Sequence, residues 1–257
     1  MLDFQRRKAF WLYYDNMGKF TISNVPVVVI IGSLTLLANF WQNALALPVS
    51  LAVGYLLLVI YQAGLVSFLR SFTAYQPLNI KQLPALVLAK LKTSVLFAAL
   101  MLFIQFVLFN AAYFYAAMAG SGLLFIVIVG LTSYLMIINL AITLIFFTVQ
   151  DYFKCSFAVA LKKSALIVVH NFFAFLAMLI QAFLLLMLSF ATVFVLFGIT
   201  NITLFFVVGT ESLILKYEYL NKNINVNKKD LWPLVLADEE QKLEGRSLKS
   251  VFMPWRD

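Results

Sequence analysis

The chain has 257 residues, of which 63% are hydrophobic and only 12% are charged, and it carries a net charge of +8. An ordinary soluble domain has about a quarter of its residues charged, so this composition excludes that class. The whole net charge comes from residues 1–216, because the basic and acidic residues after them cancel. Since these basic residues border hydrophobic stretches, we expect anionic lipid headgroups, and not nucleic acid, to be their partners.

Three long stretches contain no Asp, Glu, Lys or Arg, and they predict the fold. They are residues 20–69, 93–150 and 164–210, which hold 50, 58 and 47 residues. One helix needs roughly 20 apolar residues to cross a bilayer, so each stretch accommodates two crossings joined by a short turn. The sequence therefore predicts an all-α, polytopic membrane protein with six transmembrane helices as three hairpins. Lys and Arg concentrate on the cytoplasmic side, so both termini are expected there, N-in and C-in.

Residues 1–20 are predicted to form an amphipathic N-terminal segment in the inner membrane interface. Apolar residues recur on one side of it at helical spacing, and charged residues occupy the rest of the helix surface. The alternative is that this segment simply extends the first span. The apolar stripe consists of Phe10, Tyr13, Tyr14, Met17 and Phe20.

The transmembrane domain is expected to occupy residues 21–216. Its second span opens at Pro48, near a helix start where a missing backbone donor does least harm. Small, flexible residues predict an outer turn at 119–122, and another turn is expected at 198–201. The predicted spans are 21–40, 48–69, 93–118, 123–148, 172–197 and a last one that ends near Lys216.

Two inner loops each contain an amphipathic segment with paired lysines that leads directly into a span. The amphipathic segment of the first loop covers residues 82–92, and the second loop covers residues 150–171. Their lysines, together with the basic cluster near the N-terminus, are the candidate contacts for anionic headgroups. These candidates are Arg6, Arg7, Lys8, Lys90, Lys92, Lys162 and Lys163.

Residues 217–257 are predicted to form a cytoplasmic tail. A polar linker at 221–229 precedes apolar clusters at 231–236 and 251–255, which flank a charged run. We expect these clusters to fold back on the membrane domain or on the headgroups. Docking of a partner protein is the alternative.

The sequence contains no recognisable catalytic constellation. Its one histidine, His170, and its one cysteine, Cys155, are fifteen residues apart, with no third metal ligand nearby. No phosphate-binding glycine loop is present either. The sequence therefore predicts a non-enzymatic protein without a cofactor or a metal site.

Polar side chains inside the predicted spans are the candidate intramembrane contacts. Gln105, Asn139 and Gln181 fall near the middle of the third, fourth and fifth spans. Hydrogen bonding between helices, at about 0.6 kcal/mol per bond, is the interpretation that we favour. A polar cavity for a solute is the alternative.

Glu211 is the one acidic residue inside a predicted span. It lies about 7–8 Å along the helix axis from Lys216, and hence near the inner surface. We expect a structural ion pair with a lysine of the inner loops, for which the candidates are Lys90, Lys92, Lys162 and Lys163. A proton relay is the alternative.

Ala112, Ala116 and Gly120 recur every four residues at the outer end of the third span. Small residues at this spacing allow helix backbones to approach closely. They predict a packing seam, either inside the protein or between the protomers of a homo-oligomer.

Several segments together resemble the YesL-like family of bacterial membrane proteins, which has no established molecular activity. The resemblance spans most of the chain, and the inner amphipathic segments that enter the third and fifth spans are part of it. The other matching segments are Asn16-Met17-Gly18 with Asn24, Leu47-Pro48-Val49-Ser50 with Gly54, and the late Leu248 with Pro254-Trp255. Family members often accompany carbohydrate uptake systems.

This resemblance implies an accessory or scaffold protein of the bacterial cytoplasmic membrane that serves an ATP-driven (ABC-type) sugar importer. The alternative function is a small-solute transporter or channel in its own right, with a polar route through the three amides. A membrane-embedded enzyme ranks third.

Overall fold

The computed structural model describes residues 1–40, 46–118, 120, 122–191, 198–222 and 231–243, and every regular element in them is helical. Six of these helices are long and apolar enough to cross a membrane. The predicted all-α class with six candidate spans is therefore confirmed. The six helices are α2 (Met17–Phe40), α3 (Ala46–Thr73), α5 (Leu91–Ala117), α6 (Leu123–Phe153), α8 (Phe172–Ala191) and α9 (Ile199–Lys222).

Four shorter helices complete the described fold: α1 (Leu2–Asp15), α4 (Leu83–Ala89), α7 (Phe157–His170) and α10 (Leu231–Gln241). The two amphipathic inner segments form α4 and α7. A capping box between Asn79 and Gln82 starts the 3-10 turn Ile80–Gln82 that leads into α4. Residues 41–47, between the first two predicted spans, and the predicted turn at 119–122 fall partly outside the described residues, and the tail cluster at 251–255 falls wholly outside them.

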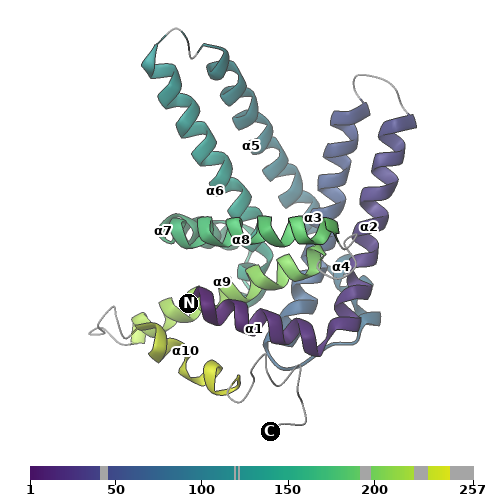
Figure 1. The fold of residues 1–257 in the computed structure, drawn as a ribbon, viewed down its shortest axis with the longest axis vertical. Helices are drawn as coiled ribbons and strands as arrows, with labels where there is room; N and C mark the ends of the chain where they lie inside the picture. Colours follow the sequence, from purple (N-terminus) through teal and green to yellow (C-terminus); the bar gives the residue numbers. More distant parts are fainter. Residues whose placement is uncertain (41–45, 119, 121, 192–197, 223–230, 244–257) are drawn as a thin grey trace.

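The three predicted hairpins do not stand side by side. In Figure 1 the α2–α3 pair and the α5–α6 pair extend in the same general direction, to the top of the view. The α8–α9 pair instead runs across the view, steeply inclined to the other two pairs, and α1 runs across below it. The third hairpin thus crosses the molecule, with α8 at about mid-height in this view and α9 just below it.

Helix α9 is the centre of the structure. It contacts α1, α2, α3, α6, α8 and α10. Of the 18 consecutive residues that form its most apolar stretch, 72% are buried inside the protein. Phe206 and Val207 on it are fully enclosed. Lipid is as apolar as these side chains, so they stabilise the fold through close packing more than through removal from water. The Phe97 ring, stacked on Phe146 at 3.9 Å between centroids, packs α5 on α6 in the same way.

The N-terminal segment is a separate short helix, and only part of its predicted stripe is exposed. Helix α1 ends at Asp15, where the Asn16 side chain donates a hydrogen bond to the Leu12 carbonyl. Helix α2 then begins at Met17, earlier than the predicted residue 21. Tyr13 and Phe20, assigned to the lipid-facing stripe, are buried in the core, so that assignment is wrong for both. The exposed apolar residues of the stripe are Phe10, Tyr14 and Met17.

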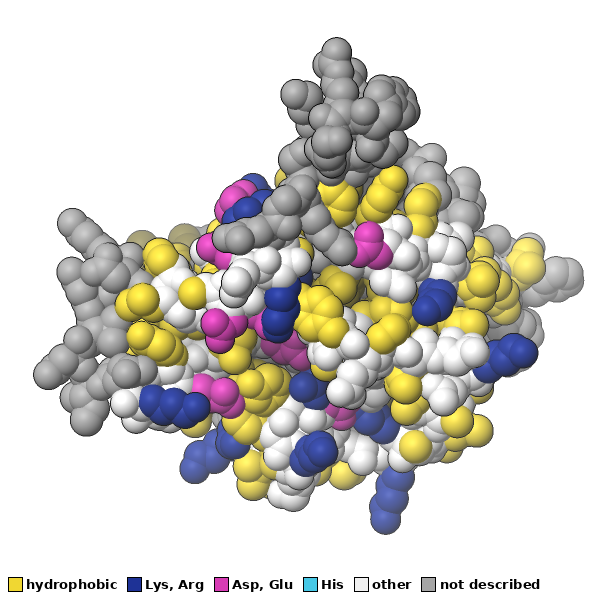
Figure 2. All heavy atoms as spheres, turned by 90° about the horizontal axis from the view of Figure 1, so that it is seen from below, with side chains coloured by type: hydrophobic (Ala, Val, Ile, Leu, Met, Phe, Trp, Pro, Cys, Tyr) yellow, Lys and Arg dark blue, Asp and Glu magenta, His cyan; other side chains and the backbone are white. Residues whose placement is uncertain are grey.

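The lower end of the molecule carries a charged face. Figure 2 shows it from below, with Lys and Arg side chains and Asp and Glu side chains gathered among apolar ones. The upper ends of α5 and α6 lie within a stretch that has no charged residue between Lys92 and Asp151. The ionised groups thus concentrate at one end of the α5–α6 pair.

Candidate functional site

An ion pair joins α3 to α9 at the charged face. Arg70 Nε lies 2.9 Å from Glu211 Oε1, and the two side chains are only 21% and 14% exposed. The Arg70 guanidinium also lies 5.2 Å from the centroid of the Tyr152 ring on α6. The Tyr152 hydroxyl donates a hydrogen bond of 3.3 Å to Glu218. One arginine therefore connects three helices at the charged face.

Glu211 does form an ion pair, but with a different partner from the one expected. The sequence pointed to the inner-loop lysines Lys90, Lys92, Lys162 and Lys163, whereas the partner is Arg70. The reason is that α3 packs directly on α9.

Lys90 is held inside the protein by Asp151 at the end of α6, with which it forms a salt bridge. The Ser67 hydroxyl donates a 2.6 Å hydrogen bond to the same carboxylate. Burial lowers the pKa of the Lys90 ammonium, and the Asp151 carboxylate opposes this shift. Lys90, a predicted headgroup contact, is therefore engaged within the fold.

A polar cavity of about 440 Å³ opens beside these residues. Three of its lining side chains are cationic and one is a carboxylate, so its chemistry suits water or a small anion. The lining residues are Ser67, Arg70, Lys90, Thr93, Gln150, Asp151, Lys154 and Cys155.

Helix α10 of the tail folds back on α1. Lys8 Nζ lies 2.5 Å from Glu239 Oε2, and Arg7 lies 3.2 Å from Glu240. Burial alone would raise the pKa of Glu239, but hydrogen bonds from Lys242 and Lys8 outweigh it and hold this pKa below its usual value. An apolar cluster completes the contact between α1 and the tail, formed by Phe4, Trp11, Leu236 and, just after α10, Leu243.

This docking places the first tail cluster on the membrane domain, one of the two positions that the sequence suggested. Arg7 and Lys8, which were expected at lipid headgroups, both pair with acidic residues of the tail, and the Arg7 side chain is still 51% exposed. The physical reason is proximity, because α1 lies against both α9 and α10.

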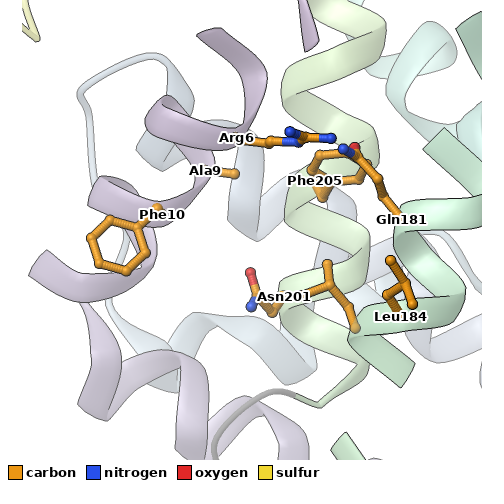
Figure 3. A pocket seen from close by; sticks show the side chains of 8 residues that line it. Arg6, Ala9, Phe10, Gln181, Leu184, Asn201 and Phe205 are labelled. Carbon is orange, nitrogen blue, oxygen red and sulfur yellow. The ribbon is translucent and has the colours of Figure 1, made fainter. Parts of the chain in front are cut away.

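A groove lies between α1, α8 and α9. Its volume is about 390 Å³ and its walls are mostly apolar. Figure 3 shows the Arg6 guanidinium beside the Gln181 carboxamide, with Phe205 close by. The Gln181 carboxamide has to be turned over so that its oxygen, instead of its nitrogen, faces Arg6, and in that orientation the oxygen accepts hydrogen bonds from the guanidinium. The groove is lined by Arg6, Ala9, Phe10, Gln181, Leu184, Leu185, Asn201 and Phe205.

The three amides predicted near mid-span lie at two separate places. Gln105 and Asn139 contact each other across the α5–α6 pair, where the Asn139 amide donates a 3.0 Å hydrogen bond to Gln105 Oε1. Gln181 instead lies beside Arg6, in the groove between α1, α8 and α9. These residues therefore do not share one polar cavity.

The small-residue seam is shorter than its spacing suggested. Helix α5 ends at Ala117, so Gly120 lies beyond the helix, and a stripe that includes it is wrong. Of the two alanines that remain on the helix, Ala116 is exposed and Ala112 is half-buried.

Three headgroup candidates remain on the inner amphipathic segments. Lys92 and Lys162 are exposed. The Lys163 ammonium lies 3.5 Å from the centroid of the Phe153 ring, so it takes part in a cation–π contact within the fold.

Sequence reasoning missed a polar contact between α2 and α9. The Ser23 and Thr200 hydroxyls lie 2.9 Å apart, and Asn24 Oδ1 accepts a 3.0 Å hydrogen bond from the Thr200 backbone amide. It also missed Gln5, which is fully buried and donates a 2.8 Å hydrogen bond to the Phe205 carbonyl. Each of these polar residues borders or interrupts an apolar helix. That pattern predicts that its side chain is buried, but it does not identify the hydrogen-bond partner.

No known protein family, curated protein or solved structure matches the chain. The resemblance to the YesL-like family therefore stays a prediction.

Proposed function

We propose that the chain is a non-enzymatic accessory or scaffold protein of the bacterial cytoplasmic membrane that binds a partner protein at its charged face. The observation that carries this proposal is the docked tail. Helix α10 is fixed to α1 by ion pairs and by a small apolar core, yet it presents Leu234 outward with 50% of its surface exposed. A partner protein would bury this apolar side chain, with the surrounding charges as the polar rim of the contact.

The proposed partner is a subunit of an ABC-type carbohydrate importer. This part of the proposal rests on the family resemblance alone. The positive-inside rule supports a cytoplasmic position for the charged face, because the inner loops and the N-terminus supply the excess of Lys and Arg. A partner on that side would meet α1 and α10 together.

Affinity purification in mild detergent tests the proposal. The tagged wild-type protein is expected to recover importer subunits, and Leu234→Asp is expected to lose them because it places a charge at the apolar anchor. Gln241→Asp is the matched control, since it adds the same charge at another exposed position of α10. Recovery of the wild-type protein alone from several detergents would contradict the proposed function.

The transporter alternative needs a continuous polar route through Gln105, Asn139 and Gln181. These side chains lie at two separate helix contacts. Solute flux in proteoliposomes that contain only this protein would favour the alternative over the accessory role.

A further inference from the structure

Arg6 differs from its two basic neighbours in α1. Arg7 pairs with Asp3 and Glu240, and Lys8 pairs with Glu239. Arg6 forms no ion pair with any carboxylate of the described residues, and its contact is the neutral Gln181. The charge of Arg6 therefore remains uncompensated at the rim of the groove between α1, α8 and α9.

Asn201 is a second polar group in this groove that lacks a partner. The residue is 9% exposed and lines the groove, and its side chain makes no hydrogen bond with any residue that the structure describes. Its amide is thus available to a ligand in the groove. Asn201 lies about one helical turn, or roughly 6 Å, from Phe205 along α9. In Figure 3 it lies in the lower part of the groove, away from Arg6.

The rest of the groove is apolar and of a size for one ligand. Leu184, Leu185 and Phe205 supply much of its wall, and its volume of about 390 Å³ falls within the range of roughly 300–1,000 Å³ for small-molecule sites. Leu184 is 62% exposed in the isolated chain. The groove thus combines an uncompensated cation, an unpartnered amide and an apolar wall that opens to the surface.

We propose that this groove binds one anionic glycerophospholipid. The phosphate accepts hydrogen bonds from the Arg6 guanidinium, whose planar donors suit a phosphate, and from the amide nitrogen of Gln181 once the oxygen of that amide is turned toward Arg6. An ester carbonyl of the lipid, a few bonds from the phosphate, accepts a hydrogen bond from Asn201. An acyl chain covers Phe205 and Leu184.

Two features favour a lipid over a free phosphate compound. The lining is mostly apolar, and it belongs to a protein with six helices that are long and apolar enough for a bilayer. A basic group between membrane helices on the cytoplasmic side is a known setting for anionic headgroups. This inference depends on the membrane class of the protein and is independent of the proposed accessory role.

The test is a lipid titration of the detergent-purified protein, with binding followed by native mass spectrometry and by the unfolding temperature. Phosphatidylglycerol is expected to bind the wild type and to raise its unfolding temperature, whereas phosphatidylcholine is expected to do so much less. In Arg6→Gln the affinity for phosphatidylglycerol is expected to fall about tenfold or more, the worth of one charge-assisted contact. Arg7→Gln, which removes the same charge at the next residue, is expected to keep the affinity.

A second variant tests the apolar part of the groove. Leu184→Trp fills the groove from an exposed position, so it is expected to abolish phosphatidylglycerol binding and leave the unfolding temperature without lipid unchanged. Free glycerol phosphate is expected not to compete. Equal affinities of Arg6→Gln and Arg7→Gln, unimpaired binding by Leu184→Trp, or competition by glycerol phosphate would each overturn the proposal.

Discussion

The substitution Glu211→Gln tests the ion pair that ties α3 to α9. It leaves the Arg70 guanidinium, which is only 21% exposed, without its carboxylate at 2.9 Å. Removing one partner of a buried pair costs about 3–5 kcal/mol, whereas an exposed pair contributes about 0.2–1 kcal/mol. This pair is mostly but not fully buried, so we expect the free energy of unfolding to fall by about 2–3 kcal/mol. On the scale of soluble domains of similar size, that corresponds to roughly 4–12 °C in the unfolding temperature.

The assay is thermal unfolding in detergent, followed by intrinsic tryptophan fluorescence. Glu240→Gln is the matched control, because the Arg7–Glu240 pair is 51% and 42% exposed and contributes at most about 1 kcal/mol. The double variant Arg70→Met with Glu211→Leu is expected to recover part of the loss, because it removes both charges. An equal effect of Glu211→Gln and Glu240→Gln would refute this reasoning. Loss of proton-coupled flux at unchanged stability would instead assign Glu211 to a proton relay.

Three further predictions concern packing, pH and assembly. Gly64→Ala is expected to lower the free energy of unfolding by about 1–3 kcal/mol, because the added Cβ would lie 2.7 Å from the α4 backbone. Gly130→Ala is the control in the same unfolding assay, because no atom lies within 4 Å of its added Cβ. The pKa of Glu239 is lowered in the folded protein, so its stabilisation of the docked tail is present above its unfolded pKa and is lost as the pH falls through the lower folded value. Limited proteolysis of the tail should therefore accelerate only at acidic pH, and Glu239→Gln should remove this pH dependence; a tail that is cleaved equally at all pH values in the wild type would contradict it. Ala116→Leu is expected to leave the unfolding temperature unchanged because Ala116 is exposed, while a changed size in gel filtration would place the seam between protomers.

The sequence predicted the helices well because hydrophobic length and charge position are local properties. The expected fourth span, 123–148, lies inside α6, and the amphipathic segment 150–171 contains α7. Differences arise mainly at the ends, where α9 continues from Lys216 to Lys222 and also begins at Ile199, in a predicted turn. Helix ends depend on local capping and packing that hydropathy does not report.

The packing partners could not be predicted from the sequence. Arg70 and Glu211 are far apart in the chain, and charge alone did not distinguish Arg70 from the inner-loop lysines. Gln181 was expected near the middle of a crossing, but the α8–α9 pair lies across the molecule and places it beside Arg6. The direction of a helix pair is set by the side chains on several facing helices, and periodicity within one helix carries no information about it.

Cysteine labelling in intact cells tests the central claim, that the ionised groups lie at the cytoplasmic face of the membrane. In a Cys155→Ser background, which removes the one native cysteine, Gly120→Cys reports on the turn between α5 and α6, and Lys162→Cys reports on α7. A membrane-impermeant maleimide is expected to label position 120 in intact cells and position 162 only after the membrane is opened. Labelling of position 162 from outside, or of position 120 only from the cytosol, would contradict the proposed topology and the partner site that depends on it.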